Sequence, residues 1–105
     1  MEYWHFSEMP YPFLPGAETC DSIRVTMPSS YMEPATAADL MQRYIKDWTV
    51  ADQAGINIMV NEHHGTATCM NAAAPLVGVA LSQVTERAMI LILGTRSPIE
   101  ETRCG

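Results

Sequence analysis

Positive charge is scarce in this sequence. Six lysines and arginines stand against twelve aspartates and glutamates, which gives a formal net charge of −6. Binding to nucleic acid or to an anionic membrane surface requires a basic face, so neither partner is expected. Apolar residues still make up 48% of the chain and charged residues 17%, which is typical of a globular domain. Residues 1–105 are therefore expected to form a single segment, long enough for one small domain and no more.

Long apolar runs and an export signal are also missing. No window approaches the ~18 consecutive apolar residues of a membrane-spanning helix. The first five residues, Met1–His5, lack the cationic and apolar regions of a secretory signal. A cytoplasmic protein is therefore expected.

Cysteine is rare and irregularly spaced. Cys20, Cys69 and Cys104 are odd in number and far apart, which argues against a disulfide framework. None of them forms the closely spaced pair that zinc sites use. All three are expected to remain reduced thiols, and no metal site is predicted.

Strand and helix signals alternate along the chain. The aromatic-rich segment Tyr3–Glu8, stopped by prolines, predicts a first strand, and an irregular connection follows from Met9 to Ala35. A helix is predicted over Thr36–Ala54, with Thr36 as its N-cap and Gly55 in a left-handed C-terminal cap. Its apolar stripe is Leu40, Tyr44, Ile45, Trp48 and Ala51, and its solvent side is Arg43, Lys46, Asp47 and Asp52.

Two more strands and one more helix follow. Strands are predicted over Ile56–Glu62 and Met89–Leu93, because each contains a short apolar run. Between them, Ala72–Val84 predicts a helix with Pro75 in its first turn. This alternation predicts an α/β fold in which the parallel strands are adjacent in chain order. Right-handed crossovers would place both helices on one face of the sheet.

Polar side chains gather where the second strand ends, at Asn61, Glu62, His63 and His64. Ligands of parallel α/β folds bind at the carboxyl ends of strands, and imidazoles exchange protons near neutral pH. Alternation places Asn61 and His63 on one face, so His63 is the candidate for chemistry while Glu62 and His64 secure the strand end. The alternatives are a polar strand end with both histidines satisfied by backbone groups, or a Glu-His-His metal site. Successive strand residues point apart, which disfavours the metal site.

These residues resemble the luciferase-like flavin-dependent monooxygenases. The run Ala54–His64 is similar to the family's second strand, which follows an alanine-glycine helix end and leads into Glu-His-His. The similarity continues through Asn71–Leu76 and Gln83–Ala88 to Leu93 and Gly94, and Trp4–Pro12 resembles the opening strand of one branch. It covers residues 1 to about 95, after which the chain departs from the family's usual continuation.

The resemblance implies the N-terminal part of an eight-stranded (β/α) TIM barrel, about three strands and two helices of it. It implies reduced flavin mononucleotide (FMN), or less favourably the deazaflavin F420, acting with dioxygen on an organic substrate. By the same resemblance His63 matches the catalytic acid/base and Asn61 lines the flavin pocket, while Gly94 and Thr95 match the strand end beneath the flavin ring. Glu8, at the end of the first strand, is either a substrate-binding residue or part of a surface salt bridge.

Length separates two hypotheses. A complete barrel needs ~250 residues, so we expect a fragment of the oxidoreductase that is unable to act alone. The competing hypothesis is a non-catalytic truncated product or a small module. Its open strand edges would pair with another chain and give a homo-oligomer.

Overall fold

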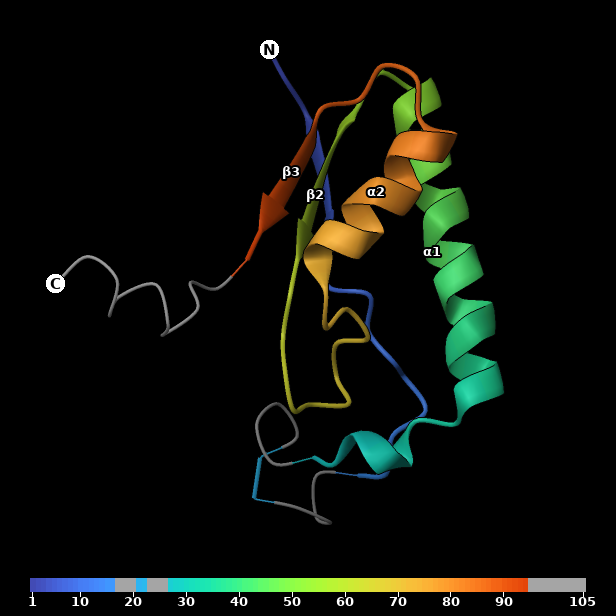
Figure 1. The fold of residues 1–105 in the computed structure, drawn as a ribbon, viewed down its shortest axis with the longest axis vertical. Helices are drawn as coiled ribbons and strands as arrows, with labels where there is room; N and C mark the ends of the chain where they lie inside the picture. Colours follow the sequence, from blue (N-terminus) through green and yellow to red (C-terminus); the bar gives the residue numbers. More distant parts are fainter. Residues whose placement is uncertain (17–20, 23–26, 95–105) are drawn as a thin grey trace, which may run out of the picture.

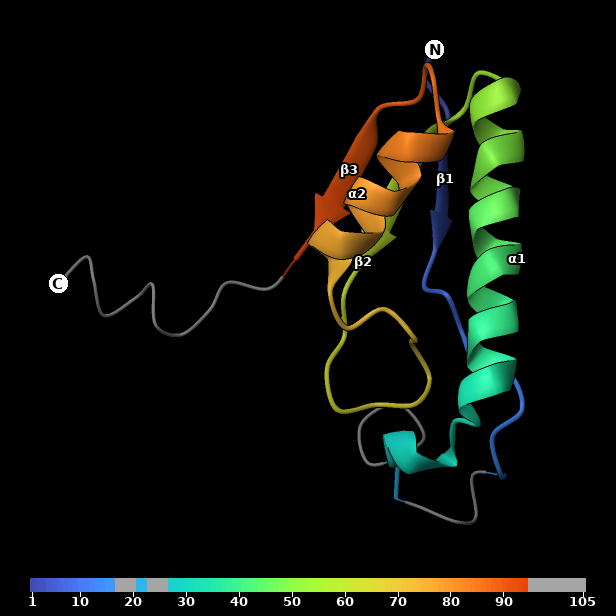
Figure 2. The same ribbon diagram turned by 45° about the vertical axis from the view of Figure 1, so that its right-hand side comes forward.

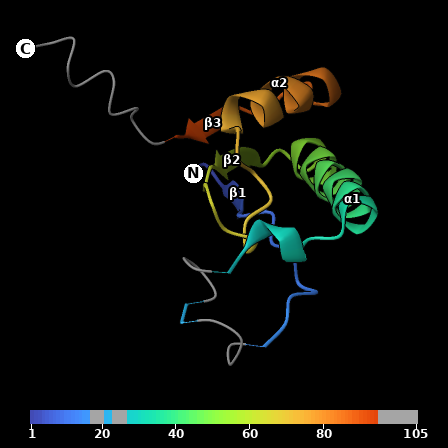
Figure 3. The ribbon, with the colours of Figure 1, turned by 60° about the horizontal axis from the view of Figure 1, so that its bottom comes forward.

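The computed structural model describes residues 1–16, 21–22 and 27–94. Within them, β1 (Trp4–Ser7), β2 (Asn57–Asn61) and β3 (Ile90–Leu93) form an open parallel sheet in the order β1-β2-β3. Helices α1 (Pro34–Gln53) and α2 (Ala74–Val84) lie on the same side of this sheet (Figures 1 and 3). The α/β class, the strand order and the parallel pairing are confirmed. The strands are slightly shorter than predicted, and a 3-10 turn, η2 (Ser29–Tyr31), lies in the connection before α1.

The start of α1 differs from the prediction. Pro34 occupies the first turn, where its fixed φ and missing N–H fit a helix. The carboxylate of Glu33 is the cap: it accepts the backbone N–H groups of Ala35 at 3.2 Å and of Thr36 at 2.7 Å. The Thr36 hydroxyl also donates to it and is the main cause of a lowered Glu33 pKa. Thr36 as N-cap is therefore wrong, because that residue already lies inside the first turn.

The end of α1 is as predicted. Gly55 has φ +78°, a left-handed backbone conformation that glycine adopts readily and residues with a side chain rarely adopt. Its N–H donates to the carbonyl of Asp52 at 3.0 Å, and the N–H of Ile56 donates to that of Ala51 at 2.9 Å. These two bonds form a Schellman motif that turns the chain from α1 into β2.

Asp52 was predicted on the solvent side of α1, and this is wrong. The residue is only 4% exposed, and its carboxylate accepts the backbone N–H groups of Glu86, Arg87 and Ala88 at 3.0, 2.9 and 2.7 Å. These bonds, that of Glu86 first, lower the pKa of Asp52. The carboxylate therefore fastens the end of α1 to the turn between α2 and β3.

The core lies between the helices and one face of the sheet (Figure 2). Ile58 and Val60 of β2 are fully buried there with Trp48 of α1 and Leu81 of α2. A Cβ built on Gly78 would lie 2.6 Å from Cδ1 of Ile92, so α2 approaches β3 closely at that position. The predicted apolar stripe of α1 is confirmed, since its members are buried or packed against this core.

The opposite face of the sheet carries exposed apolar side chains. Trp4 and Phe6 pair in register with β2, and Leu91 and Leu93 pair with it from the other side. Their exposed fractions are 36%, 46%, 41% and 42%, in that order. We call these four residues the helix-free face.

Candidate functional site

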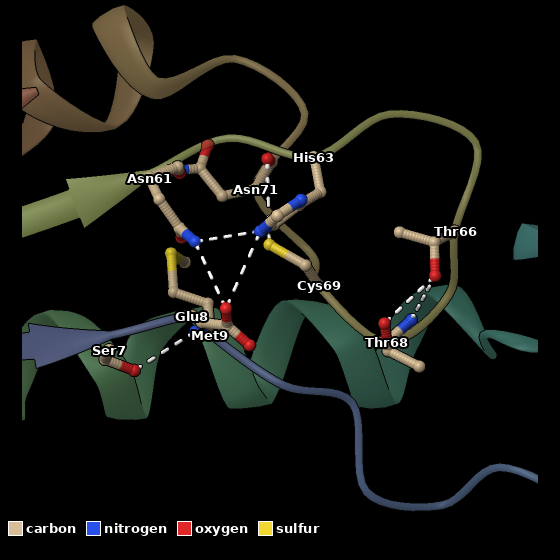
Figure 4. Close-up of polar contacts among 9 residues, drawn as sticks. All are labelled: Ser7, Glu8, Met9, Asn61, His63, Thr66, Thr68, Cys69 and Asn71. Atoms are coloured by element: carbon tan, nitrogen blue, oxygen red, sulfur yellow. Dashed lines mark hydrogen bonds and ion pairs between the residues drawn. The ribbon is translucent and has the colours of Figure 1, made fainter. Parts of the chain in front are cut away.

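The carboxyl ends of β1 and β2 bring three predicted site residues together. Figure 4 shows Glu8, Asn61 and His63 converging from the two neighbouring strands. The Asn61 amide nitrogen lies 2.9 Å from Nε2 of His63 and 3.4 Å from Oε1 of Glu8, while His63 Nε2 and Glu8 Oε1 are 3.6 Å apart. The side chains of His63 and Glu8 are 38% and 37% exposed, so solvent or a ligand can reach both. Glu8 therefore forms a partly exposed ion-pair contact with His63 at the end of the strands.

Asn61 is the buried member of this cluster. It is 9% exposed, and its amide nitrogen faces both other residues. Its Oδ1 is buried and has no hydrogen-bond partner among the described residues. An orphan acceptor of this kind costs about 1–3 kcal/mol. The fold therefore tolerates the cost of an unpaired Oδ1, while the amide nitrogen of Asn61 contacts His63 and Glu8.

Glu62 and His64 point to the other face, as the alternation predicts. Oε2 of Glu62 accepts the N–H of Ala74 at 2.9 Å, at the first residue of α2. Nε2 of His64 lies 3.0 Å from the carbonyl oxygen of Ala72 and 3.3 Å from Oε1 of Glu62. These contacts attach the end of β2 to the start of α2, which is the securing role that the sequence suggested.

Asn71 supports the site from the loop between β2 and α2, and sequence reasoning missed it. Its side-chain amide donates to the carbonyl of Asn61 at 2.7 Å, and its own carbonyl accepts the N–H of His63 at 3.0 Å. Its Oδ1 accepts the N–H of Ala73 at 3.2 Å. The residue is 2% exposed. An asparagine directly before a predicted helix was the available signal, because such residues bond to nearby backbone groups.

Met9 forms the other support, and it was also missed. It has φ 51°, which is uncommon for any residue other than glycine, and its side chain is fully buried. Its N–H donates to Oγ of Ser7 at 3.1 Å, and its carbonyl accepts the N–H of Met70 at 3.0 Å. The chain therefore turns immediately after Glu8 and is joined there to the β2–α2 loop.

Gly94 and Thr95 are the two other residues predicted for the site. Gly94 follows β3, and a Cβ built on it would lie 4.0 Å from Oε1 of Glu62, on the side of the sheet that faces the helices. The structure thus sets Gly94 beside Glu62. Thr95, predicted with it, lies outside the described residues, as do Cys20 and Cys104. Cys69 is a buried thiol whose Sγ lies 3.9 Å from the carbonyl of Asn71.

A surface depression of about 330 Å³ lies at the opposite end of the sheet. Its lining comes from the end of α1 and the turn before β3: Thr49, Asp52, Gln53, Val84, Glu86 and Arg87. It is therefore remote from the carboxyl ends of the strands. Among the described residues, no group of three or more histidine, cysteine, aspartate or glutamate side chains is arranged to hold a metal ion.

Comparison with known proteins adds no neighbour. No family model, no curated protein and no solved structure matches this chain. In the part of the chain that the structure describes, no helix is both long and apolar enough to cross a membrane.

Proposed function

We propose that this chain supplies the first three strands of a (β/α) barrel that acts as a luciferase-like flavin-dependent monooxygenase, with His63 as its acid/base. The observation that carries the proposal is the convergence of Glu8, Asn61 and His63 at the carboxyl edge of a parallel sheet. Active sites of (β/α) barrels lie at this edge. The proposal accounts for a buried amide and a carboxylate meeting there around one partly exposed imidazole.

The helix-free face would suit the ring system of a flavin. In a barrel this side of the sheet is the interior, and its exposed Trp4, Phe6, Leu91 and Leu93 offer apolar contacts beside the polar cluster. The lysine and arginine residues that the structure describes lie on α1 and on the turn before β3, away from the carboxyl ends. The described residues therefore fit the ring and offer no cationic phosphate site.

In this proposal, reduced flavin supplies the reaction with dioxygen when it is bound. The chain's own side chains bind, orient and exchange protons. His63 is the group that transfers the proton, because an imidazole can both accept and donate one and this side chain is 38% exposed. Asn61 and Glu8 hold the imidazole ring of His63. In the complete barrel, the apolar side chains of the helix-free face would exclude water from the interior.

The test uses a complete luciferase-like barrel that carries residues 1–94 of this sequence. We expect His63→Ala to lower flavin-dependent turnover by roughly 10²–10⁴-fold with nearly unchanged thermal stability, since that is the scale of a positioned acid/base group. His64→Ala is the matched control. It lies on the other face, so we expect a lower thermal midpoint and a smaller loss of rate. Equal rate losses, or full activity in His63→Ala, would overturn the proposal.

A second candidate function is favoured by the helix-free face itself. In the described part of the chain, β1 and β3 each have one unpaired edge, and four large apolar side chains lie exposed between those edges. Such a surface suits a small module that pairs with another chain. Sedimentation equilibrium distinguishes this function, which requires concentration-dependent association that Leu91→Glu abolishes. A monomer at all concentrations would argue against it.

A further inference from the structure

In two adjacent histidines, His63 and His64, the same ring atom, Nε2, faces a hydrogen-bond donor in one and an acceptor in the other. Nε2 of His63 lies 2.9 Å from the amide nitrogen of Asn61, whereas Nε2 of His64 lies 3.0 Å from the carbonyl oxygen of Ala72. An amide NH₂ group can only donate a hydrogen bond, and a carbonyl oxygen can only accept one. In their neutral forms His63 must therefore carry its proton on Nδ1, and His64 on Nε2.

The orientation of the Asn61 amide decides the first of these assignments, and Glu8 fixes that orientation. Exchanging the amide oxygen and nitrogen would place Oδ1 about as far from Oε1 of Glu8 as the nitrogen now is, 3.4 Å. Two acceptors would then face each other, one of them charged. In the observed orientation the NH₂ group has two hydrogens and two acceptors, while Oδ1 is left buried without a partner among the described residues.

The contact between His63 and Glu8 becomes important only when the ring is protonated. At 3.6 Å, Nε2 and Oε1 are too far apart for a good hydrogen bond to a neutral ring. A protonated ring has a hydrogen on Nε2, which repels the donor NH₂ of Asn61 and is attracted to the Glu8 carboxylate. Nδ1 lies on the side of the ring away from both partners (Figure 4).

We infer that Asn61 and Glu8 are positioning residues that select which nitrogen of His63 carries the proton, and that Nδ1 is the nitrogen that exchanges protons with a reactant. Asn61 holds the neutral ring with its proton on Nδ1. The resting ring takes up a proton from solvent at Nε2, and Glu8 then holds the protonated ring through Nε2–H. When the protonated ring gives its Nδ1 proton to a reactant, the neutral ring that remains keeps its proton on Nε2, facing Glu8. Loss of that proton and uptake of one at Nδ1 from solvent restore the resting form.

The tautomers are measurable in this chain without any cofactor. We expect long-range ¹H–¹⁵N spectra of the labelled protein at alkaline pH to show an unprotonated Nε2 for His63 and a protonated Nε2 for His64. Asn61→Asp replaces the donor with an acceptor of the same shape. It should shift the tautomer ratio of His63 towards Nε2–H by roughly 5- to 10-fold, the factor for one net hydrogen bond. His64 is the internal control and should not change.

Glu8→Gln tests the second positioning residue. A glutamine amide can present either its oxygen or its nitrogen to Asn61, so both orientations of the Asn61 amide become satisfiable and the neutral ring of His63 should become a mixture of both tautomers. A protonated Nε2 on neutral His63 in the unmodified protein would overturn the inference, and so would a His63 tautomer that Asn61→Asp does not move. The mechanistic part of the inference rests on the proposed function, but this measurement does not. The expected tautomers together with an inactive barrel would remove the proposed function alone.

Discussion

Gly55→Ala offers a clean measure of how strongly the connection between α1 and β2 depends on one backbone conformation. Gly55 has φ +78°, and a Cβ built there meets no atom within 4 Å. The cost of a side chain is therefore backbone strain without any steric clash. A left-handed conformation costs an L-residue about 1–2 kcal/mol. Alanine recovers about 0.4–1 kcal/mol of this by restricting the unfolded chain. The net loss should be about 1 kcal/mol.

For a domain of this size, a loss of that magnitude lowers the thermal midpoint by about 4–8 °C. Far-UV circular dichroism during thermal and urea unfolding would measure it. Gly94→Ala is the matched control. A Cβ there meets only Oε1 of Glu62, at 4.0 Å, and the backbone is not left-handed, so stability should change by less than about 0.5 kcal/mol. An unchanged midpoint in Gly55→Ala, or equal losses in both variants, would refute the assignment of the cap.

Three further predictions follow from the structure. Because backbone N–H donors lower the pKa of Asp52, its contribution to stability is present above the ordinary carboxyl pKa of 3.8 and disappears as pH falls through the lowered value. Asp52→Asn should thus reduce the thermal midpoint at neutral pH and flatten its decline in acid, and equal slopes for both proteins would contradict this. Leu81→Ala, at a fully buried position of α2, should cost about 2–5 kcal/mol in urea unfolding, whereas Leu76→Ala on the same helix, at a residue 71% exposed, should cost less than about 0.5 kcal/mol. Fluorescence titration should show that the chain alone binds FMN weakly or not at all. Each missing hydrogen bond to the charged phosphate removes about 1.5–3 kcal/mol of binding free energy, so submicromolar affinity would contradict the proposal that this chain contacts only the flavin ring.

The parts of the fold that could be predicted from sequence are those set by local periodicity. Alternation along a strand is a property of the extended backbone, so the separation of Asn61 and His63 from Glu62 and His64 followed directly. The same holds for Gly55, because a left-handed helix end selects glycine whatever surrounds it. The contact of Glu8 with His63 was not predicted, since it depends on the register between strands that lie far apart in the chain.

The features that could not be predicted arise from contacts between distant segments or from unusual local choices. Asp52 stands four residues after Trp48, so the helical period places it on the apolar side of α1, and only its charge suggested the solvent side. Its hydrogen-bond partners lie in a turn 34 residues further along the chain, which no local pattern indicates. Glu33 is the cap in place of the expected Thr36 because α1 begins at Pro34, two residues earlier than predicted, so the free N–H groups of its first turn include those of Ala35 and Thr36. Met9 adopts a conformation that its residue type disfavours, so no propensity indicates it.

The distance in sequence between the two halves of the candidate site has a kinetic consequence. Glu8 and Asn61 are separated by 53 residues, whereas the contacts that join β2 to β3 span 32. Loop-closure entropy grows with the logarithm of that separation, a difference of about 0.4 kcal/mol here. Asp52 further restrains the shorter closure by holding the turn before β3. The β2–α2–β3 unit should therefore form first during folding and β1 should dock onto it afterwards. His63 would then acquire its partners from β1 in the final step, and slowing that step would delay assembly of the site without delaying formation of the helices.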